Sequence, residues 1–317
     1  PIHKTSKKLL KKPMRIITRM CPQKIYGLEQ GIKRMKEVIV TGATGFIGRN
    51  IVPLLANLDY KIYLITRDKK FCNQLFKRLP VEIIEWNITK GAPKLNLQKS
   101  SALLHLAWEG LPNYNSLHHT EKNLISNYLF IKEFLNLGVT SLVVTGTCLE
   151  YGMKSGILEV DDECNPTTPY GLAKHSLHRL LRFLQNEIDF NLAWARLFYA
   201  TGADQSPNSI IPQLDQAIDR NDKQFNMSKG EQLRDYLPVN KIAEDLVTLL
   251  IGRLNGTYNV CSGNPIAIRT LVENRIEERK SSIRLNLGYY SYPKYEPMAF
   301  WGKPNIPKRK APLDHKK

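Results

Sequence analysis

The chain has 317 residues, of which 42% are hydrophobic, so it can fold around a full core, and intrinsic disorder is excluded. Its formal net charge is +17, but residues 1–36 account for +10 and residues 303–317 for +5, which leaves +2 for residues 37–302. A near-neutral body argues against a nucleic-acid-binding protein, and no run of about 18 apolar residues is present that could span a membrane.

The two ends differ from the body in composition. Residues 1–36 form a basic N-terminal extension. Met35 and Lys36 stand directly before the first predicted strand, so we expect that residues 1–34 precede the native start of the protein. A basic arm that touches a membrane or nucleic acid, and a solvated tail, are the alternatives. Residues 303–317 form a second basic tail. The five cysteines include no Cys-x-x-Cys pair, which argues against a disulfide framework or a zinc site and favours a reducing, cytoplasmic setting.

Short β-rich runs alternate with helical patterns through the first half of the chain. Strands are predicted at 37–41, 61–66, 81–85, 101–106 and 140–146, and helices at 46–57, 69–78, 117–137 and 170–187. The runs 62–65 and 142–145 are almost continuously apolar, which is typical of parallel strands covered on both faces. This order predicts an α/β fold with a doubly wound parallel sheet, a Rossmann fold.

The second half of the chain has a different pattern. After about residue 198, glycines and prolines punctuate shorter elements, until a helical pattern at 240–253 and the run 256–261 return to the pattern of the sheet. We therefore expect a dinucleotide-binding domain over 37–198, with its sheet completed by parts of 236–262. Most of 199–302 is expected to form a smaller C-terminal substrate-binding domain.

A glycine-rich turn joins the first predicted strand to the first helix. Gly42, Gly45 and Gly48 have the spacing G-x-x-G-x-x-G in the segment 38–48. Glycines at such positions allow a tight turn, a close approach of the backbone to a pyrophosphate, and close packing of helix on strand. Because strand and helix are both predicted around it, the turn indicates dinucleotide binding rather than a plain βα connection.

The end of the second predicted strand bears on the choice of cofactor. An acidic residue there would hold the 2′-hydroxyl of NAD, whereas a guanidinium suits the 2′-phosphate of NADP. The chain has Arg67 at this place, which favours NADP. Asp68 follows directly and could bind the ribose if the strand ended later, so NAD stays open.

Tyr170 and Lys174 are four residues apart at the start of a predicted helix, so their side chains share one face. A cation beside a phenol favours the phenolate, and we therefore expect Lys174 to bring the pKa of Tyr170 closer to neutral pH. Tyr170 is then a candidate general acid and base.

Together these segments resemble the extended short-chain dehydrogenase/reductases of the NAD-dependent epimerase/dehydratase family, most of which act on nucleotide sugars. The resemblance covers about 37–302. It rests on the segments 41–48, 104–107, 145–152, 170–174, 196–202, 233–239 and 256–260.

The resemblance implies roles for individual residues. Thr147 matches the catalytic Ser/Thr that orients the substrate carbonyl for Tyr170, and Lys174 would hold the nicotinamide ribose. Asn87 and Ile88 stand where the family usually has an acidic residue near the adenine. The expected cofactor contacts are Gly42, Thr44, Gly45, Phe46, Ile47, Gly48, Arg67, Asn87, Ile88, Leu106, Ala107, Trp108, Tyr170, Lys174 and Phe198, and the expected substrate contacts are Thr147, Tyr199 and Arg234.

The family's pattern leaves two reactions open, neither of which uses a metal, and a non-catalytic alternative. Sugar dehydratases of the family have an acidic pair after the active-site Thr, whereas this chain has Cys148 and Leu149, so elimination of water is disfavoured. We predict an NADP-dependent reductase of a nucleotide-linked 4-keto-6-deoxyhexose, with hydride transfer to the sugar C4 and Tyr170 as general acid. A NAD-dependent nucleotide-sugar 4-epimerase is the first alternative, and a non-catalytic nucleotide-binding protein the second. Family members commonly form homodimers through paired helices.

Some conspicuous groups have a plainer explanation. His118 and His119 are adjacent on a predicted helix and face different directions, so we expect surface or packing roles rather than metal binding. The acidic run 161–163 is expected to be a solvated loop. The tyrosines at 289, 290, 292 and 295, with Trp301, are expected to pack at a domain edge.

Overall fold

The computed structural model describes residues 37–307. The predictions for the N-terminal extension 1–36, and for most of the basic tail 303–317, therefore fall outside the described residues. Within the described range no helix is both long and apolar enough to pass through a bilayer.

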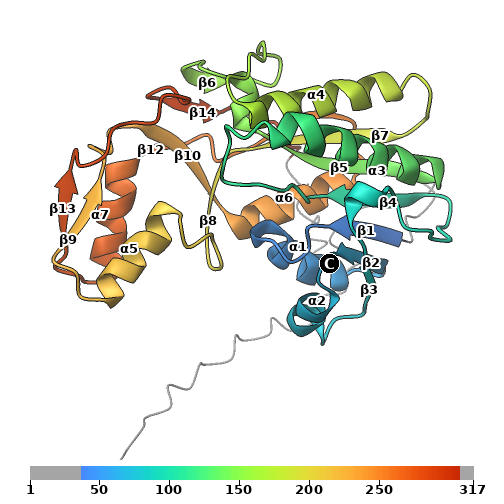
Figure 1. The fold of residues 1–317 in the computed structure, drawn as a ribbon, viewed down its shortest axis with the longest axis horizontal. Helices are drawn as coiled ribbons and strands as arrows, with labels where there is room; N and C mark the ends of the chain where they lie inside the picture. Colours follow the sequence, from blue (N-terminus) through green and yellow to red (C-terminus); the bar gives the residue numbers. More distant parts are fainter. Residues whose placement is uncertain (1–36, 308–317) are drawn as a thin grey trace, which may run out of the picture. The chain divides into compact units, whose positions relative to one another are not determined.

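The centre of the fold is a seven-stranded sheet in which every neighbouring pair is parallel (Figure 1). Its strand order is β11-β7-β5-β4-β1-β2-β3, so the chain starts in the middle and winds outward in both directions. The strands are β1 (Glu37–Thr41), β2 (Lys61–Thr66), β3 (Val81–Glu85), β4 (Ser101–His105), β5 (Val139–Thr147), β7 (Asn191–Leu197) and β11 (Gly256–Val260). The predicted doubly wound Rossmann sheet is confirmed.

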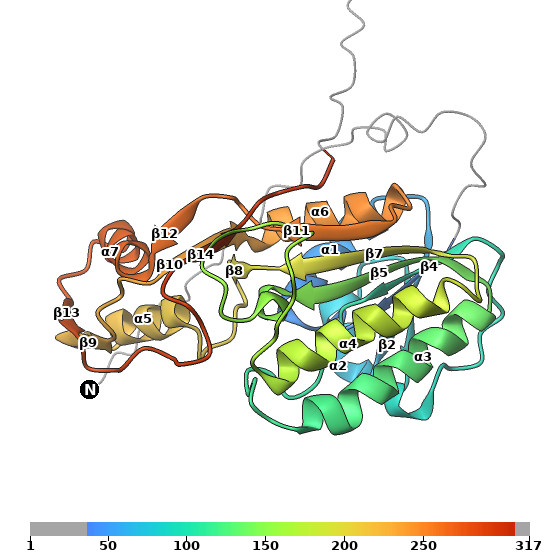
Figure 2. The same cartoon turned by 90° about the horizontal axis from the view of Figure 1, so that it is seen from above.

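Helices cover both faces of this sheet (Figure 2). On one face α1 (Phe46–Ala56) packs against α6 (Val239–Ile251), and on the other α3 (Leu124–Asn136) packs against α4 (Pro169–Leu184). The helix α2 (Lys69–Phe76) follows β2 and lies beside α1, where Arg49 stacks on the ring of Phe71. Strand residues such as Ile39, Leu103 and Leu142 are fully buried between the layers.

The predicted elements of the first half agree closely with the structure, with two differences. The helix expected over 117–137 is divided, because His119–Asn123 form a π-helical turn before α3 begins at Leu124. The strand β7 was not predicted, because its apolar residues are mainly alanine and leucine and it contains Asn191 and Arg196. The helix and strand expected to return to the sheet are α6 and β11.

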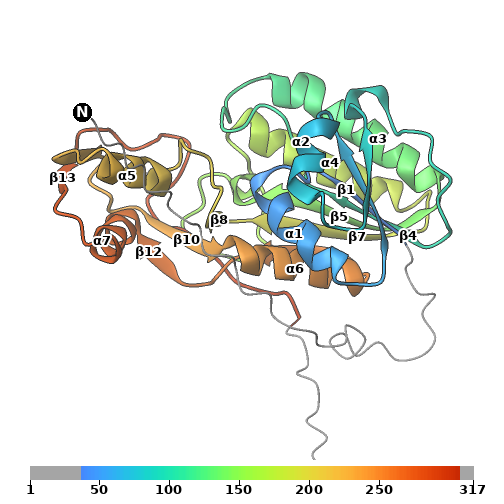
Figure 3. The same ribbon diagram turned by 90° about the horizontal axis from the view of Figure 1, so that it is seen from below.

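The remaining elements are short and pair across long stretches of sequence. The helices α5 (Ile210–Asp219) and α7 (Ile268–Glu278) enclose a separate apolar cluster with β9 (Gln224–Met227) and β13 (Arg284–Leu287), which pair with each other (Figure 3). The strand β10 (Leu233–Pro238) lies between β8 (Tyr199–Thr201) and β12 (Pro265–Ala267). Finally, β14 (Phe300–Gly302) pairs with β6 (Gly156–Leu158), which ties the end of the described chain to the segment after β5.

Candidate active site

The glycine turn between β1 and α1 is built so that side chains are excluded. A Cβ atom on Gly42 would lie 2.8 Å from the backbone nitrogen of Ala107, and one on Gly48 would lie 2.3 Å from the carbonyl oxygen of Gly42. Gly45 is the N-cap of α1 and offers no side chain to the first turn, so the amide N–H groups of Phe46 and Ile47 have no capping acceptor. This arrangement fits the pyrophosphate of a dinucleotide.

A cavity of about 340 Å³ opens beside this turn, at the carboxyl ends of β1, β2 and β4. Most of the expected cofactor contacts line it, namely Gly42, Thr44, Gly45, Arg67, Asn87, Ile88, Leu106, Ala107 and Trp108. Phe46, Ile47 and Gly48 form the adjoining start of α1, whereas Tyr170, Lys174 and Phe198 are not among the residues that line this cavity. Its place, where the strand order reverses, is the usual ligand crevice of open α/β sheets.

A buried polar network holds the strand ends around the cavity. The Thr41 hydroxyl accepts hydrogen bonds from the backbone N–H groups of Leu106 and Ala107, each at 3.2 Å. His105 bonds to that hydroxyl through Nδ1 and to the Asn127 amide through Nε2. Burial lowers the pKa of His105 to about 3, so the ring is neutral and the network carries no buried charge.

The three expected catalytic residues come together at the end of β5 and the start of α4. Thr147 ends β5, where its hydroxyl accepts from the N–H of Leu149 at 3.3 Å, and its side chain is near enough to the Tyr170 phenol to act on the pKa of that group. The approach is close because Gly171 has no side chain, since a Cβ there would lie 2.6 Å from the carbonyl oxygen of Leu149. Lys174 is buried and donates to the carbonyl oxygen of Thr145 at 2.8 Å.

The electrostatics of the pair differ from the sequence-based expectation. Burial raises the pKa of Tyr170 above its usual range, the nearby Tyr114 raises it further, and the Thr147 side chain acts in the opposite direction. Burial also lowers the pKa of Lys174 to about 7, with Glu150 opposing that shift. The expected lowering of the Tyr170 pKa by Lys174 is therefore absent, because desolvation outweighs any attraction between the two groups.

Trp108 connects the cavity to the expected catalytic residues Tyr170 and Lys174. Its indole ring lies 4.0 Å from the Lys174 ammonium and 6.0 Å from the centre of the Tyr170 ring. The indole N–H donates to Nδ1 of His119 at 3.1 Å, and Nε2 of His119 bonds to the carbonyl oxygen of Asn113 at 2.8 Å. Since Nδ1 accepts, the proton is on Nε2, and His119 is a buried neutral support for Trp108.

Two aromatic neighbours of Tyr170 were not predicted to belong to the site. The centre of the His119 ring lies 5.3 Å from that of Tyr170, and the centre of the Tyr114 ring lies 5.4 Å from it. Tyr295 packs on the other side of Tyr114 at 5.9 Å. The packing role expected for His119 agrees with this placement, but its contact with the catalytic tyrosine had no signal in the sequence.

The expected substrate residues Tyr199 and Arg234 belong to a neighbouring buried cluster. Glu296 accepts a short hydrogen bond from the Tyr199 hydroxyl and pairs with Arg234 at 3.0 Å. The Arg234 side chain is 1% exposed and lies 4.5 Å from the ring of Phe300. Phe198 is buried beside this cluster. Arg234 is thus held by a carboxylate rather than presented to an open surface, and a diphosphate contact would require that pair to open.

Two expected cofactor residues have local structural partners. The Asn87 amide oxygen caps the turn η2 (Ile88–Lys90) by accepting from the N–H of Thr89. Arg67 forms an ion pair with Glu109. Asp68, the alternative ribose ligand, caps α2 by accepting from the N–H of Phe71 at 2.8 Å.

Near Thr147, three side chains of kinds that can bind metal ions lie close together. Ligand atoms of Glu150, Cys164 and His175 are within 4.8 Å of one another. Arg196 already contacts Glu150 and Cys164 at 3.0 Å each, so a positive charge is supplied by the chain itself. A further metal cation would be repelled there, and we assign no metal to this group.

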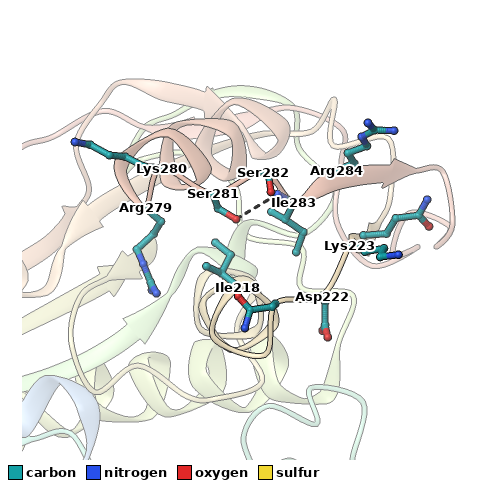
Figure 4. A pocket seen from close by; sticks show the side chains of 11 residues that line it. Ile218, Asp222, Lys223, Arg279, Lys280, Ser281, Ser282, Ile283 and Arg284 are labelled. Carbon is teal, nitrogen blue, oxygen red and sulfur yellow. Dashed lines mark hydrogen bonds between the residues drawn. The ribbon is translucent and has the colours of Figure 1, made fainter. Parts of the chain in front are cut away.

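A second hollow lies apart from these residues, where the helices α5 and α7 end (Figure 4). It has a volume of about 700 Å³ and is lined by polar groups, with Ser281 accepting a hydrogen bond from the N–H of Ile283. Arg279 is paired with Asp215 and Asp219, so the hollow offers no unpaired guanidinium at that position. None of the expected site residues lines it.

Comparison with known proteins gives consistent matches. A model of the NAD dependent epimerase/dehydratase family matches residues 38–261. The chain is similar to dTDP-6-deoxy-L-talose 4-dehydrogenase (NAD(+)) of Aggregatibacter actinomycetemcomitans, with 31% identity over 84% of this chain and 98% of that protein. It is also similar to GDP-6-deoxy-D-talose 4-dehydrogenase of the same organism, with 25% identity over 72% and 74% of the two chains. Among solved structures, UDP-N-acetylglucosamine 4-epimerase from Methanobrevibacter ruminantium M1 in complex with UDP-N-acetylmuramic acid has the same fold, with a TM-score of 0.74, 22% identity, and coverage of 85% of this chain and 90% of that one.

Proposed function

We propose, from the premise that this chain belongs to the NAD-dependent epimerase/dehydratase family, that it is an NADP-dependent reductase of a nucleotide-linked 4-keto-6-deoxyhexose. Both talose relatives are named as 4-dehydrogenases of 6-deoxy sugar nucleotides, which is the same conversion written in the opposite direction. Substrate binding is proposed to use residues 199–302, with Tyr199 and Arg234 among the contacts.

The chain's own residues would divide the chemistry between them. The Thr147 hydroxyl would hold the C4 carbonyl oxygen, and the Tyr170 phenol would donate a proton to that oxygen as it gains charge. Lys174 would bind the ribose next to the reacting ring of the cofactor. A bound NADPH would supply the hydride.

The observation that carries this proposal is the placement of a buried Tyr170 phenol near Thr147 at the end of β5 and against the Trp108 ring, which also contacts the Lys174 ammonium. A phenol whose pKa is raised by burial keeps its proton at neutral pH and is ready to act as an acid. Reduction of a ketone needs this form, whereas oxidation of an alcohol needs the phenolate. A protonated Tyr170 is the form that ketone reduction requires, although an unshifted phenol, with a pKa near 10, also carries its proton at neutral pH.

The choice of NADP rests on Arg67, which follows the last residue of β2 and lines the cavity. A guanidinium at this place is a natural partner for a 2′-phosphate. The talose relative with 31% identity carries NAD(+) in its name, so NAD is the alternative.

The direct test is incubation with NADPH, and in parallel with NADH, and a panel of nucleotide-linked 4-keto-6-deoxyhexoses. We expect reduced-nicotinamide absorbance to fall in proportion to the alcohol formed, faster with NADPH. If the enzyme only interconverted UDP-hexoses without net oxidation of cofactor, it would be a 4-epimerase. If it bound dinucleotide and converted neither class, the non-catalytic alternative would replace our proposal.

We further propose that the protein is a homodimer through α3 and α4. Ile125 and Leu129 are 50% and 47% exposed and lie one helical turn apart on α3. Leu172 and Phe183, on the neighbouring α4, are 47% and 61% exposed and lie three turns apart, so they share a face. Apolar side chains in such a group are typical of an association surface.

A further inference from the structure

Two charged side chains meet at the cavity beside the glycine turn. Arg67 follows β2 and Glu109 follows β4, so they come from two strands that flank β1. Both line the cavity, and their side chains form an ion pair. Among the described residues Glu109 is the only ion-pair partner of Arg67, and the two side chains are 62% and 38% exposed.

Glu109 is fixed more firmly than Arg67. Its backbone carbonyl oxygen accepts a hydrogen bond from the Asn123 amide at 2.9 Å. Its second carboxylate oxygen lies 3.7 Å from Nε2 of His118. Asn123 is itself buried in the π-helical turn before α3. These contacts therefore hold the Glu109 carboxylate at the cavity, and the longer Arg67 side chain extends to meet it.

The neighbouring acid cannot take over this role without cost. Asp68 caps α2 by accepting from the N–H of Phe71, so a ligand would compete with the helix for its carboxylate. Glu109 is therefore the acidic group of the cavity that is available to a ligand at the end of β2.

From this pair we propose that Glu109 is a specificity-determining residue that sets the ratio of NADP to NAD binding by competing for Arg67. The inference rests on the proposed dinucleotide site. A 2′-phosphate can bind Arg67 only by displacing or sharing a carboxylate of the same charge sign, which weakens NADP binding. A 2′-hydroxyl can instead donate to Glu109, which favours NAD. At the 2′ position of the adenosine ribose, Arg67 thus favours the phosphate of NADP, whereas Glu109 favours the hydroxyl of NAD.

The test measures binding of two fragments, adenosine 2′,5′-bisphosphate and ADP, by calorimetry on the full chain without substrate. We expect Glu109→Gln to strengthen the bisphosphate relative to ADP by about 10-fold, because a charge-assisted hydrogen bond to Arg67 is freed. Arg67→Gln should shift the ratio in the opposite direction. In the double variant the effect of Glu109→Gln should be clearly smaller than in the wild-type background, because no guanidinium remains to be released and only the direct contact of Glu109 with the ligand is lost.

Two control variants separate this account from simpler ones. Glu85→Gln removes an exposed carboxylate that neighbours Thr66 in the sheet and does not line the cavity, so it corrects for the change in net charge. Asp68→Ser keeps a capping side chain and should leave the ratio unchanged. The proposal is overturned if Glu109→Gln changes the ratio no more than Glu85→Gln does, or if Asp68→Ser changes it more. If the folded wild type binds neither fragment, the assignment of the cavity as a dinucleotide site is wrong, and the proposed function is wrong as well.

Discussion

Burial decides the protonation states of the catalytic residues. Tyr170 keeps its proton and Lys174 loses part of its charge, because each is enclosed by neighbouring side chains rather than by water. Trp108 lies against both groups and is itself held by His119. The residue-scale predictions follow from these shifts and from the proposed role of the Tyr170 phenol as proton donor.

Replacing Tyr170 with Phe should remove the proton donor while keeping the ring in its packing position. We expect kcat to fall by about 10²- to 10⁴-fold, the usual contribution of general acid catalysis. The dissociation constant of NADPH, followed by fluorescence titration, should change by no more than about twofold. Equal loss of cofactor binding and of folding would instead assign the phenol a structural role.

Lys174 predicts how stability depends on pH. Its pKa is lowered in the folded state to about 7 from 10.5, so between these values the unfolded chain binds more protons and stability rises with pH. The penalty is complete below pH 7 and disappears above 10.5. Buried cysteines such as Cys72, whose pKa is raised to about 11, begin to oppose this trend above about pH 8.5.

In urea unfolding of the wild type, the free energy of unfolding should therefore increase by about 1–2 kcal/mol from pH 7 to about pH 8.5. Lys174→Met, which has no titrating group, should lack this increase. An unchanged pH slope in the methionine variant would show that other groups control the trend.

Tyr170 and Lys174 could be proposed from the sequence because their spacing is local, and Thr147 because of the resemblance to the family, and their catalytic roles stay predictions. Tyr114, His119 and Glu296 could not, because they reach the site through loops and a π-helical turn whose geometry has no short sequence signal. The shifted pKa of Tyr170 was also beyond the sequence, since burial is a property of the packed molecule.

At the scale of elements, the turn between β1 and α1 controls how the strand, the helix and the segment after β4 approach one another. Gly48→Ala should destabilise the fold by about 1–3 kcal/mol, since the new Cβ would meet the Gly42 carbonyl at 2.3 Å and the Ala43 Cα at 2.6 Å. Gly45→Ala is the matched control, because its Cβ meets only the Gly42 carbonyl at 3.3 Å. Thermal and urea unfolding measure both, and equal stability of the two variants would contradict the packing argument.

Elements with local signals were predicted well, and those that depend on distant partners were not. The strands β1, β2 and β3 have the predicted bounds because each is a compact β-rich run. The pairing of β9 with β13 joins residues about 60 positions apart, and no local pattern specifies it. The strand β7 was missed because Asn191, Arg196 and its alanines weaken its apolar pattern, and the charge of Arg196 is explained by its buried partner Glu150.

At the scale of the whole molecule, the exposed apolar side chains of α3 and α4 predict self-association. Replacing Ile125 and Leu129 together by Glu should convert a dimer to a monomer in sedimentation experiments, because four charges would enter the shared surface of the dimer. Replacing Leu75 of α2, which is 37% exposed, by Glu should leave the dimer intact. A monomeric wild type would remove this proposal without affecting the chemistry of the site.

The central claim is net transfer of a hydride to the sugar C4 while Tyr170 supplies the proton. Its most direct measurement uses NADPH that carries deuterium at the transferable position of nicotinamide C4, with the product of a 4-keto-6-deoxy nucleotide sugar examined by NMR. We predict one deuterium at the sugar C4 for each NADPH consumed. A product without deuterium at that carbon, formed without loss of NADPH, would contradict the account.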